Sequence, residues 1–185
     1  MKKLIKKYGH IWMLSYAFIY LPWFSRLQEN VNKPYHVMHT ALDDLIPFNE
    51  YFIVPYLMWF LYVAATIAFF FFKNRDDYYR LCTFLFTGMK NIFCYLVSRL
   101  WSIDPCINVF PSIHVYNSVG VHIAICHSEE LKKHPMIVRA SGVLMVLICL
   151  ATMFLKQHSV IDVVGALLMA SVIYPIAYAP EAEKK

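Results

Sequence analysis

The sequence predicts an all-α membrane protein in which six transmembrane helices form one bundle, with a short amphipathic helix at the membrane interface. Of the 185 residues, 59% are hydrophobic and only 16% are charged, whereas a soluble domain carries about 25% charged residues. Six apolar runs each approach the roughly 20 residues that a membrane span needs. Lys and Arg gather in alternate loops. This pattern argues against a soluble enzyme, a nucleic-acid-binding domain and a disordered chain.

The six helices follow from these runs in order along the chain. The first two runs contain no charged side chain, the third contains Lys90 near its middle, and the fifth contains Arg139 near its start. The first run lacks a small-residue cleavage site after it and is interpreted as an uncleaved anchor. Because the connections are short, residues 1–185 are expected to form a single domain. The spans are expected at residues 8–25, 51–72, 80–101, 111–127, 136–155 and 159–178.

The distribution of positive charge predicts the topology. With six spans, both termini lie on the same side of the membrane, and twelve Lys and Arg residues lie on that side. The opposite side holds four, namely Arg26, Lys33, Arg99 and Lys156. Because positive charge is retained in cytoplasmic loops, both termini are predicted to be cytoplasmic. The small, lysine-rich chain favours the cell membrane of a bacterium.

The long loop between the first two spans, residues 26–50, carries an amphipathic pattern. Apolar residues recur there at helical spacing, opposite a polar face that includes His36, His39 and Asp43. This pattern predicts a short helix lying at the membrane interface. The three polar side chains could form a metal site, but a solvated polar face is the favoured interpretation.

A first group of chemically informative residues, Pro-Ser-Ile-His at 111–114, stands where the fourth span begins. Pro111 suits the first turn of a helix, where its missing N–H costs nothing. The free N–H groups of that turn and the Ser112 hydroxyl then form an anion site. His114 would lie one turn deeper, near a bound phosphate.

A second group stands where the sixth span begins, and the topology places both groups on the extracytoplasmic side. His158 and Asp162 are four residues apart and share a helix face. A carboxylate at that distance accepts one imidazole N–H and leaves the other nitrogen free to attack. Lys156 adds a cation, and an ionisable group such as Asp162 inside a span needs a partner. Together these residues predict a catalytic site.

The two motifs resemble those of the type 2 phosphatidic acid phosphatase superfamily. Residues 111–114 are similar to its Pro-Ser-x-His motif, and residues 158–162 to its His-x-x-x-Asp motif. The six-span layout is also similar. Asp-Asp-Leu-Ile-Pro-Phe at 43–48 and Lys-Gln-His at 156–158 resemble the branch that includes inositol phosphorylceramide synthase-like proteins. The resemblance covers residues 40–178.

The resemblance implies a lipid phosphate phosphatase that works through a phosphohistidine, without a metal or a cofactor. His158 would be the nucleophile, Asp162 would hold its ring, and His114 would protonate the leaving oxygen. The substrate would be a lipid phosphate or diphosphate in the outer leaflet of the bilayer, and no nucleic-acid partner is expected. The phosphate ligands would be Ser112, Lys156 and Arg99.

Two alternatives rest on details of these motifs. The Lys-Gln-His variant favours a phosphotransferase that moves a phospho-head-group onto a lipid alcohol. Departures from the family pattern favour a catalytically weak relative that only binds lipid phosphate. Thr152 stands where the family usually has Arg, and the family's Lys-x6-Arg-Pro is replaced by Lys90 and Arg99, nine residues apart. Side chains nine residues apart lie on opposite faces of a helix.

Overall fold

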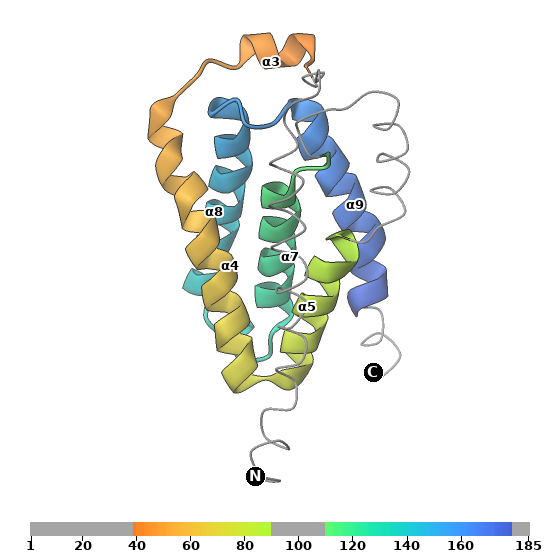
Figure 1. Ribbon diagram of the computed structural model, residues 1–185. Helices are drawn as coiled ribbons and strands as arrows, with labels where there is room; N and C mark the ends of the chain where they lie inside the picture. The colour runs from red at the N-terminus through yellow and green to blue at the C-terminus, as the bar shows by residue number, and fades with distance from the viewer. Residues whose placement is uncertain (1–38, 90–109, 179–185) are drawn as a thin grey trace, which may run out of the picture.

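The computed structural model describes residues 39–89 and 110–178, and every element in them is helical (Figure 1). This confirms the all-α class. The predicted span at residues 8–25, and the predicted third span beyond residue 89, lie outside the described residues. Two 3-10 turns, η2 (Glu50–Phe52) and η3 (Leu131–Lys133), precede α4 and α8. The α-helices are α3 (Ala41–Leu45), α4 (Ile53–Lys73), α5 (Arg75–Met89), α7 (Ile113–His127), α8 (Pro135–Phe154) and α9 (Val160–Tyr178).

Helix α7 lies in the middle of the bundle and packs against α4, α5, α8 and α9 (Figure 1). Because a helix at the centre of a bundle is buried all round, its buried side chains are not confined to one face. They are Val115, Tyr116, Asn117, Ser118, Val121, Ala124 and Ile125, together with Gly120. The N-terminus of α7 therefore emerges among the ends of the surrounding helices.

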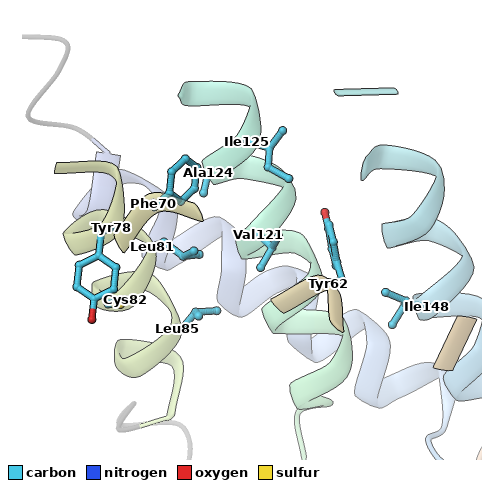
Figure 2. Close-up of a cluster of buried hydrophobic side chains, with 10 residues drawn as sticks. All are labelled: Tyr62, Phe70, Tyr78, Leu81, Cys82, Leu85, Val121, Ala124, Ile125 and Ile148. Atoms are coloured by element: carbon cyan, nitrogen blue, oxygen red, sulfur yellow. The ribbon is translucent and has the colours of Figure 1, made fainter. Parts of the chain in front are cut away.

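Two apolar clusters hold the bundle together. The first joins α4, α5, α7 and α8 and includes Tyr62, Phe70, Leu81 and Val121 (Figure 2). The second joins α5, α7 and α9. In it, the rings of Phe84 and Tyr116 stack with centroids 4.9 Å apart, and the Tyr116 hydroxyl donates to the Phe84 carbonyl at 2.7 Å. Since lipid is as apolar as these side chains, close packing and such hydrogen bonds stabilise the helix contacts.

A polar cluster ties three helices together inside the bundle. The hydroxyls of Tyr62 on α4 and Ser141 on α8 are 2.5 Å apart, and Nδ1 of His122 on α7 lies 3.0 Å from the same Ser141 oxygen. Buried polar groups are costly unless they are hydrogen-bonded. Ser141 meets this requirement for both of its partners, so the cluster connects α4, α7 and α8.

Three helical segments are long and apolar enough to cross a membrane, by length and composition: Glu50–Lys73, Pro135–Phe154 and Val160–Tyr178. Their lengths of 24, 20 and 19 residues match the roughly 20 residues of a span. The prediction of a membrane protein is therefore supported at this level, and three of the predicted spans correspond to these segments.

The helices at the third and fourth predicted spans differ from the prediction. Helix α7 has 15 residues and measures about 22 Å, less than the roughly 30 Å of a hydrocarbon core. It begins at Ile113, after its N-cap Ser112, and neighbouring helices cover it. Helix α5 begins at Arg75 and not at residue 80, because the side chain of Asn74 accepts the N–H groups of Asp76 and Asp77. Its described part also has 15 residues.

The connections alternate between the two ends of the bundle. The turn between α4 and α5 and the connection through η3 lie at one end (Figure 1). Helix α3, the first residues of α4, α7 and α9, and the last residues of α8 lie at the other end (Figure 1). The two polar motifs, which precede α7 and α9, are therefore brought to the same end.

Candidate active site at one end of the bundle

Ser112 stands at the start of α7, in direct contact with the first turn of α9. Its backbone N–H donates to the carbonyl of Asp162 at 3.3 Å, and its carbonyl accepts from the N–H of Tyr116. The side chain is fully buried, and its hydroxyl makes no cap bond to α7. Helix α7 begins at Ile113, two residues later than predicted. The predicted place of Ser112 at a helix N-terminus is nevertheless what the structure shows.

His114 lies one residue inside α7 and packs against two aromatic rings of α4. The ring of Tyr56 stacks on it with centroids 4.6 Å apart, and the ring of Trp59 lies at 4.4 Å with a tilt of 46°. These contacts fix the plane of the imidazole. Sequence reasoning missed both aromatic residues, because the chain holds 31 aromatic side chains and nothing in their spacing singles out these two.

His158 and Asp162 form the pair that their spacing predicts. Nδ1 of His158 lies 3.3 Å from Oδ2 of Asp162, which also accepts the N–H of Ser159 at 3.0 Å. The Asp162 side chain is fully buried, and that of His158 is 11% exposed. With its proton on Nδ1, His158 donates to the carboxylate, and its Nε2 then carries a lone pair.

The structure brings His114 and His158 together although they are far apart in the sequence. Their ring centroids are 6.1 Å apart, and the ring planes are inclined by 54°. One ring comes from α7 and the other from the connection between α8 and α9. Two imidazoles at this separation can contact one small ligand at the same time, as acid–base and nucleophilic groups do.

Several buried polar atoms at this end have no hydrogen-bond partner in the described part of the chain. They include Ser112 Oγ, His114 Nδ1, Asp162 Oδ1 and Trp59 Nε1. Buried polar groups in proteins are nearly always satisfied, so a cluster of unpartnered ones indicates a place for a polar ligand or water. Three of the four belong to residues that the sequence predicts for the site.

Of the two predicted cationic ligands, Lys156 and Arg99, the structure describes only Lys156, and its ammonium group is bound elsewhere. The ammonium group of Lys156 donates to the carbonyls of Asp43, at 2.6 Å, and Ile46. It is thus held against the segment around α3. Arg99 lies outside the described residues, as does Lys90. Thr152 is buried, and its hydroxyl donates to the Cys149 carbonyl.

Asp43 is the residue at this end that sequence reasoning misjudged. The sequence predicts a solvated polar face, yet Asp43 is buried against the start of α9. Its carboxylate accepts from the hydroxyl of Ser159 at 2.5 Å, from the N–H of Val160 at 2.9 Å, and from both the N–H and the hydroxyl of Thr40. Burial raises the pKa of Asp43, but these hydrogen bonds outweigh burial and lower it to about 2.

The alternative of a metal site at this helix is not supported by the described side chains. His39 pairs instead with the exposed Asp44, with 3.0 Å between Nε2 and Oδ1, and His36 lies outside the described residues. Within residues 39–89 and 110–178, no three His, Cys, Asp or Glu side chains are grouped as a metal site requires. The Thr-x-x-Asp spacing of Thr40 and Asp43 is typical of a capping box at a helix N-terminus, and this pattern could have identified the role of Asp43 from the sequence.

An apolar cavity of about 220 Å³ lies beside the motif that precedes α7. The ring of Phe110 packs against Gly165, where an added Cβ would lie 2.4 Å from the ring and would displace it. Phe110 and Pro111 directly precede Ser112, so the cavity begins next to the polar cluster. It is lined by Phe110, Pro111, Gly165, Leu168, Met169 and Val172.

No family model, curated protein or solved structure matches this chain. The chemistry therefore has to be inferred from the residues themselves.

Proposed function

We propose that this protein is a metal-independent lipid phosphate phosphatase of the type 2 phosphatidic acid phosphatase kind, working through a phosphohistidine. The observation that carries the proposal is the pairing of His158 with the buried Asp162, 6.1 Å from a second imidazole, His114. The unpartnered Ser112 hydroxyl beside this pair supports a bound oxyanion.

The first step forms a bond between Nε2 of His158 and the phosphorus of the substrate. The bond from phosphorus to the lipid oxygen breaks, and His114 gives that oxygen a proton. Asp162 stabilises the positive charge that develops on the His158 ring and keeps its other nitrogen protonated. The products of this step are the lipid alcohol and the phosphohistidine.

The second step releases the phosphate. His114, now neutral, takes a proton from water, and the water oxygen attacks the phosphorus. The bond from phosphorus to Nε2 breaks, which restores His158 and frees inorganic phosphate. The Ser112 hydroxyl and the N–H groups of the residues that follow it would hold the phosphate oxygens in both steps, with Arg99 as a further proposed ligand.

The proposed substrate is a lipid because a polar site and an apolar cavity adjoin. The cavity that starts at Phe110 and Pro111 suits an acyl or prenyl chain whose phosphate lies at Ser112. We infer six spans in all, with the termini in the cytoplasm and the site at the extracytoplasmic leaflet, since the loop charges favour this orientation. A bacterial cell membrane remains our assignment of location.

Two other functions have a specific observation in their favour. The Lys-Gln-His sequence at 156–158 favours transfer of a phospho-head-group to a lipid alcohol, in which case that hydroxyl replaces water in the second step. The binding of Lys156 to the carbonyls of Asp43 and Ile46 removes one cation from the phosphate, which favours a weak relative that only binds lipid phosphate.

The test is a panel of lipid phosphates and diphosphates, supplied to the purified protein in detergent with a chelator, with and without a lipid alcohol. Phosphate release or a new phospholipid, read by mass spectrometry, identifies hydrolysis or transfer. His158→Ala should abolish turnover, whereas His134→Ala, a substitution of an exposed histidine at the opposite end, should not. Turnover that persists in His158→Ala would exclude the proposed nucleophile, and thermal stabilisation without turnover would favour the binding protein.

A further inference from the structure

The chain around His158 is held from both sides by one short segment, residues 40–46. On the C-terminal side, the carboxylate of Asp43 accepts from the Ser159 hydroxyl and the Val160 N–H. On the N-terminal side, the ammonium group of Lys156 donates to the carbonyls of Asp43 and Ile46. The two sets of bonds thus enclose His158, which lies between them in the sequence.

Hydrogen bonds connect Asp43 through Ser159 and Asp162 to the proposed nucleophile, His158. Ser159 donates a hydrogen bond from its hydroxyl to the carboxylate of Asp43 and another from its backbone N–H to the carboxylate of Asp162. The Asp162 oxygen that accepts this N–H is also the one that lies 3.3 Å from the imidazole of His158. Asp43 therefore fixes the residue that orients the carboxylate partner of His158.

The contact of Lys156 depends on an unusual backbone conformation. Its φ of 56° lies in the left-handed region, which is unfavourable for a residue other than glycine. Such conformations persist where the surroundings enforce them, often at functional sites. Here the turn directs the long side chain toward α3, where two carbonyls accept its protons.

We propose that Asp43 and Lys156 form a clamp that positions His158, so that Lys156 serves the site as a positioning residue and not as a phosphate ligand. This inference deepens the proposed function and rests on it for its kinetic consequences. A displacement of about 1 Å at a reacting group can lower the rate roughly 100-fold. A loop carrying the nucleophile needs such tethers because it is not itself helical.

The first test compares Asp43→Ala and Asp43→Asn with Asp44→Asn as the matched control, since Asp44 is the exposed neighbour that pairs only with His39 among the described contacts. We expect Asp43→Ala to lower kcat roughly 10- to 100-fold with little change in KM. Asp43→Asn should be intermediate, because its amide oxygen can still accept the Val160 N–H. Asp44→Asn should match the wild type, and an unchanged kcat in Asp43→Ala would overturn the clamp.

The second test separates a clamp from a phosphate ligand at Lys156. In a clamp, Lys156→Ala lowers kcat, and the double variant with Asp43→Ala is little worse than either single variant, because both act on the same loop. In a phosphate site, Lys156→Ala raises KM, and its effect multiplies that of Asp43→Ala. The second pattern would contradict our assignment.

A third measurement does not depend on turnover. NMR of ¹⁵N-labelled histidine reports which ring nitrogen of His158 carries the proton, with the signal assigned by its loss in His158→Gln. We expect a single tautomer protonated at Nδ1 in the wild type and in Asp44→Asn, and averaged signals in Asp43→Ala. If no lipid phosphate is turned over but this change appears, the proposed function fails and the clamp stands. A wild-type spectrum in Asp43→Ala refutes the clamp.

Discussion

Two histidines on α7 show how one helix can use the same side chain in different ways. His122, in the middle of the bundle, shares the Ser141 hydroxyl with Tyr62, and the three residues join three helices. His114, two turns earlier, is held by the faces of two aromatic rings, and its Nδ1 has no partner in the described part of the chain. A satisfied histidine stabilises the fold, whereas an unsatisfied one beside a second imidazole is available to a ligand.

The largest difference between the two histidines should appear in catalysis. Replacing His114 by Gln removes the proposed general acid, and we expect kcat to fall about 10²- to 10⁴-fold. His122→Gln lies far from the reacting groups and should leave kcat unchanged. Phosphate release from the best lipid of the panel measures kcat in both variants. An equal loss of kcat in the two would contradict the difference in role between His114 and His122.

The next prediction tests whether the apolar cavity near His114 belongs to the ligand site. Leu168→Trp would fill the apolar cavity, and we expect kcat/KM for a long-chain lipid phosphate to fall roughly 10-fold, while a short-chain substrate is affected less. Val164→Trp provides the control, because Val164 is exposed on the same helix and is not among the residues that line the cavity. Equal effects on long and short chains would argue that the cavity takes no part in substrate binding.

For the cluster around His122, we expect a substitution to lower stability and to leave activity unchanged. Ser141→Ala leaves the Tyr62 hydroxyl and the His122 ring without their shared partner, and we expect a loss of about 1–3 kcal/mol in the free energy of unfolding. Activity at a temperature where the variant is folded should equal that of the wild type. Urea or SDS titration followed by tryptophan fluorescence measures the first quantity, and a loss of activity at full folding would contradict the structural role.

The smallest expected effect concerns the pH dependence of stability. The folded pKa of Asp43 is about 2, below its ordinary value of 3.8. Its hydrogen bonds therefore contribute full stability above pH 4, and this contribution is lost as the pH falls from about 4 through 2. Thermal unfolding in detergent across this range should show a smaller decrease in Asp43→Asn than in the wild type or Asp44→Asn. An identical dependence of the unfolding temperature on pH in the wild type and both variants would argue that the hydrogen bonds of Asp43 do not contribute to stability.

The parts of the site that could be predicted are those encoded by short spacing. His158 and Asp162 are one helical turn apart, so their pairing follows from the sequence. The approach of His114 to His158 follows from the topology, because both stand at helix starts that the alternation of spans places at one end. The membrane class likewise follows from the apolar runs, although α7 begins two residues later than its run.

The parts that could not be predicted depend on contacts between distant segments. Asp43 was judged from the polar face of its own helix, and periodicity says nothing of a carboxylate that binds the start of α9. Lys156 was assigned by its nearness to His158 in the sequence, but its left-handed backbone directs the side chain elsewhere. Tyr56 and Trp59 are two aromatic residues among many, and only the packing of α4 on α7 identifies them.

The bonds from Asp43 to Ser159 and Val160 also have a consequence for biosynthesis. They join residues that are 116 and 117 positions apart, so they cannot form until the ribosome has released the chain as far as Val160. Until then, His114 lacks the imidazole of His158 beside it. If the proposed function holds, insertion intermediates that lack α9 are therefore expected to be inert toward the surrounding lipids.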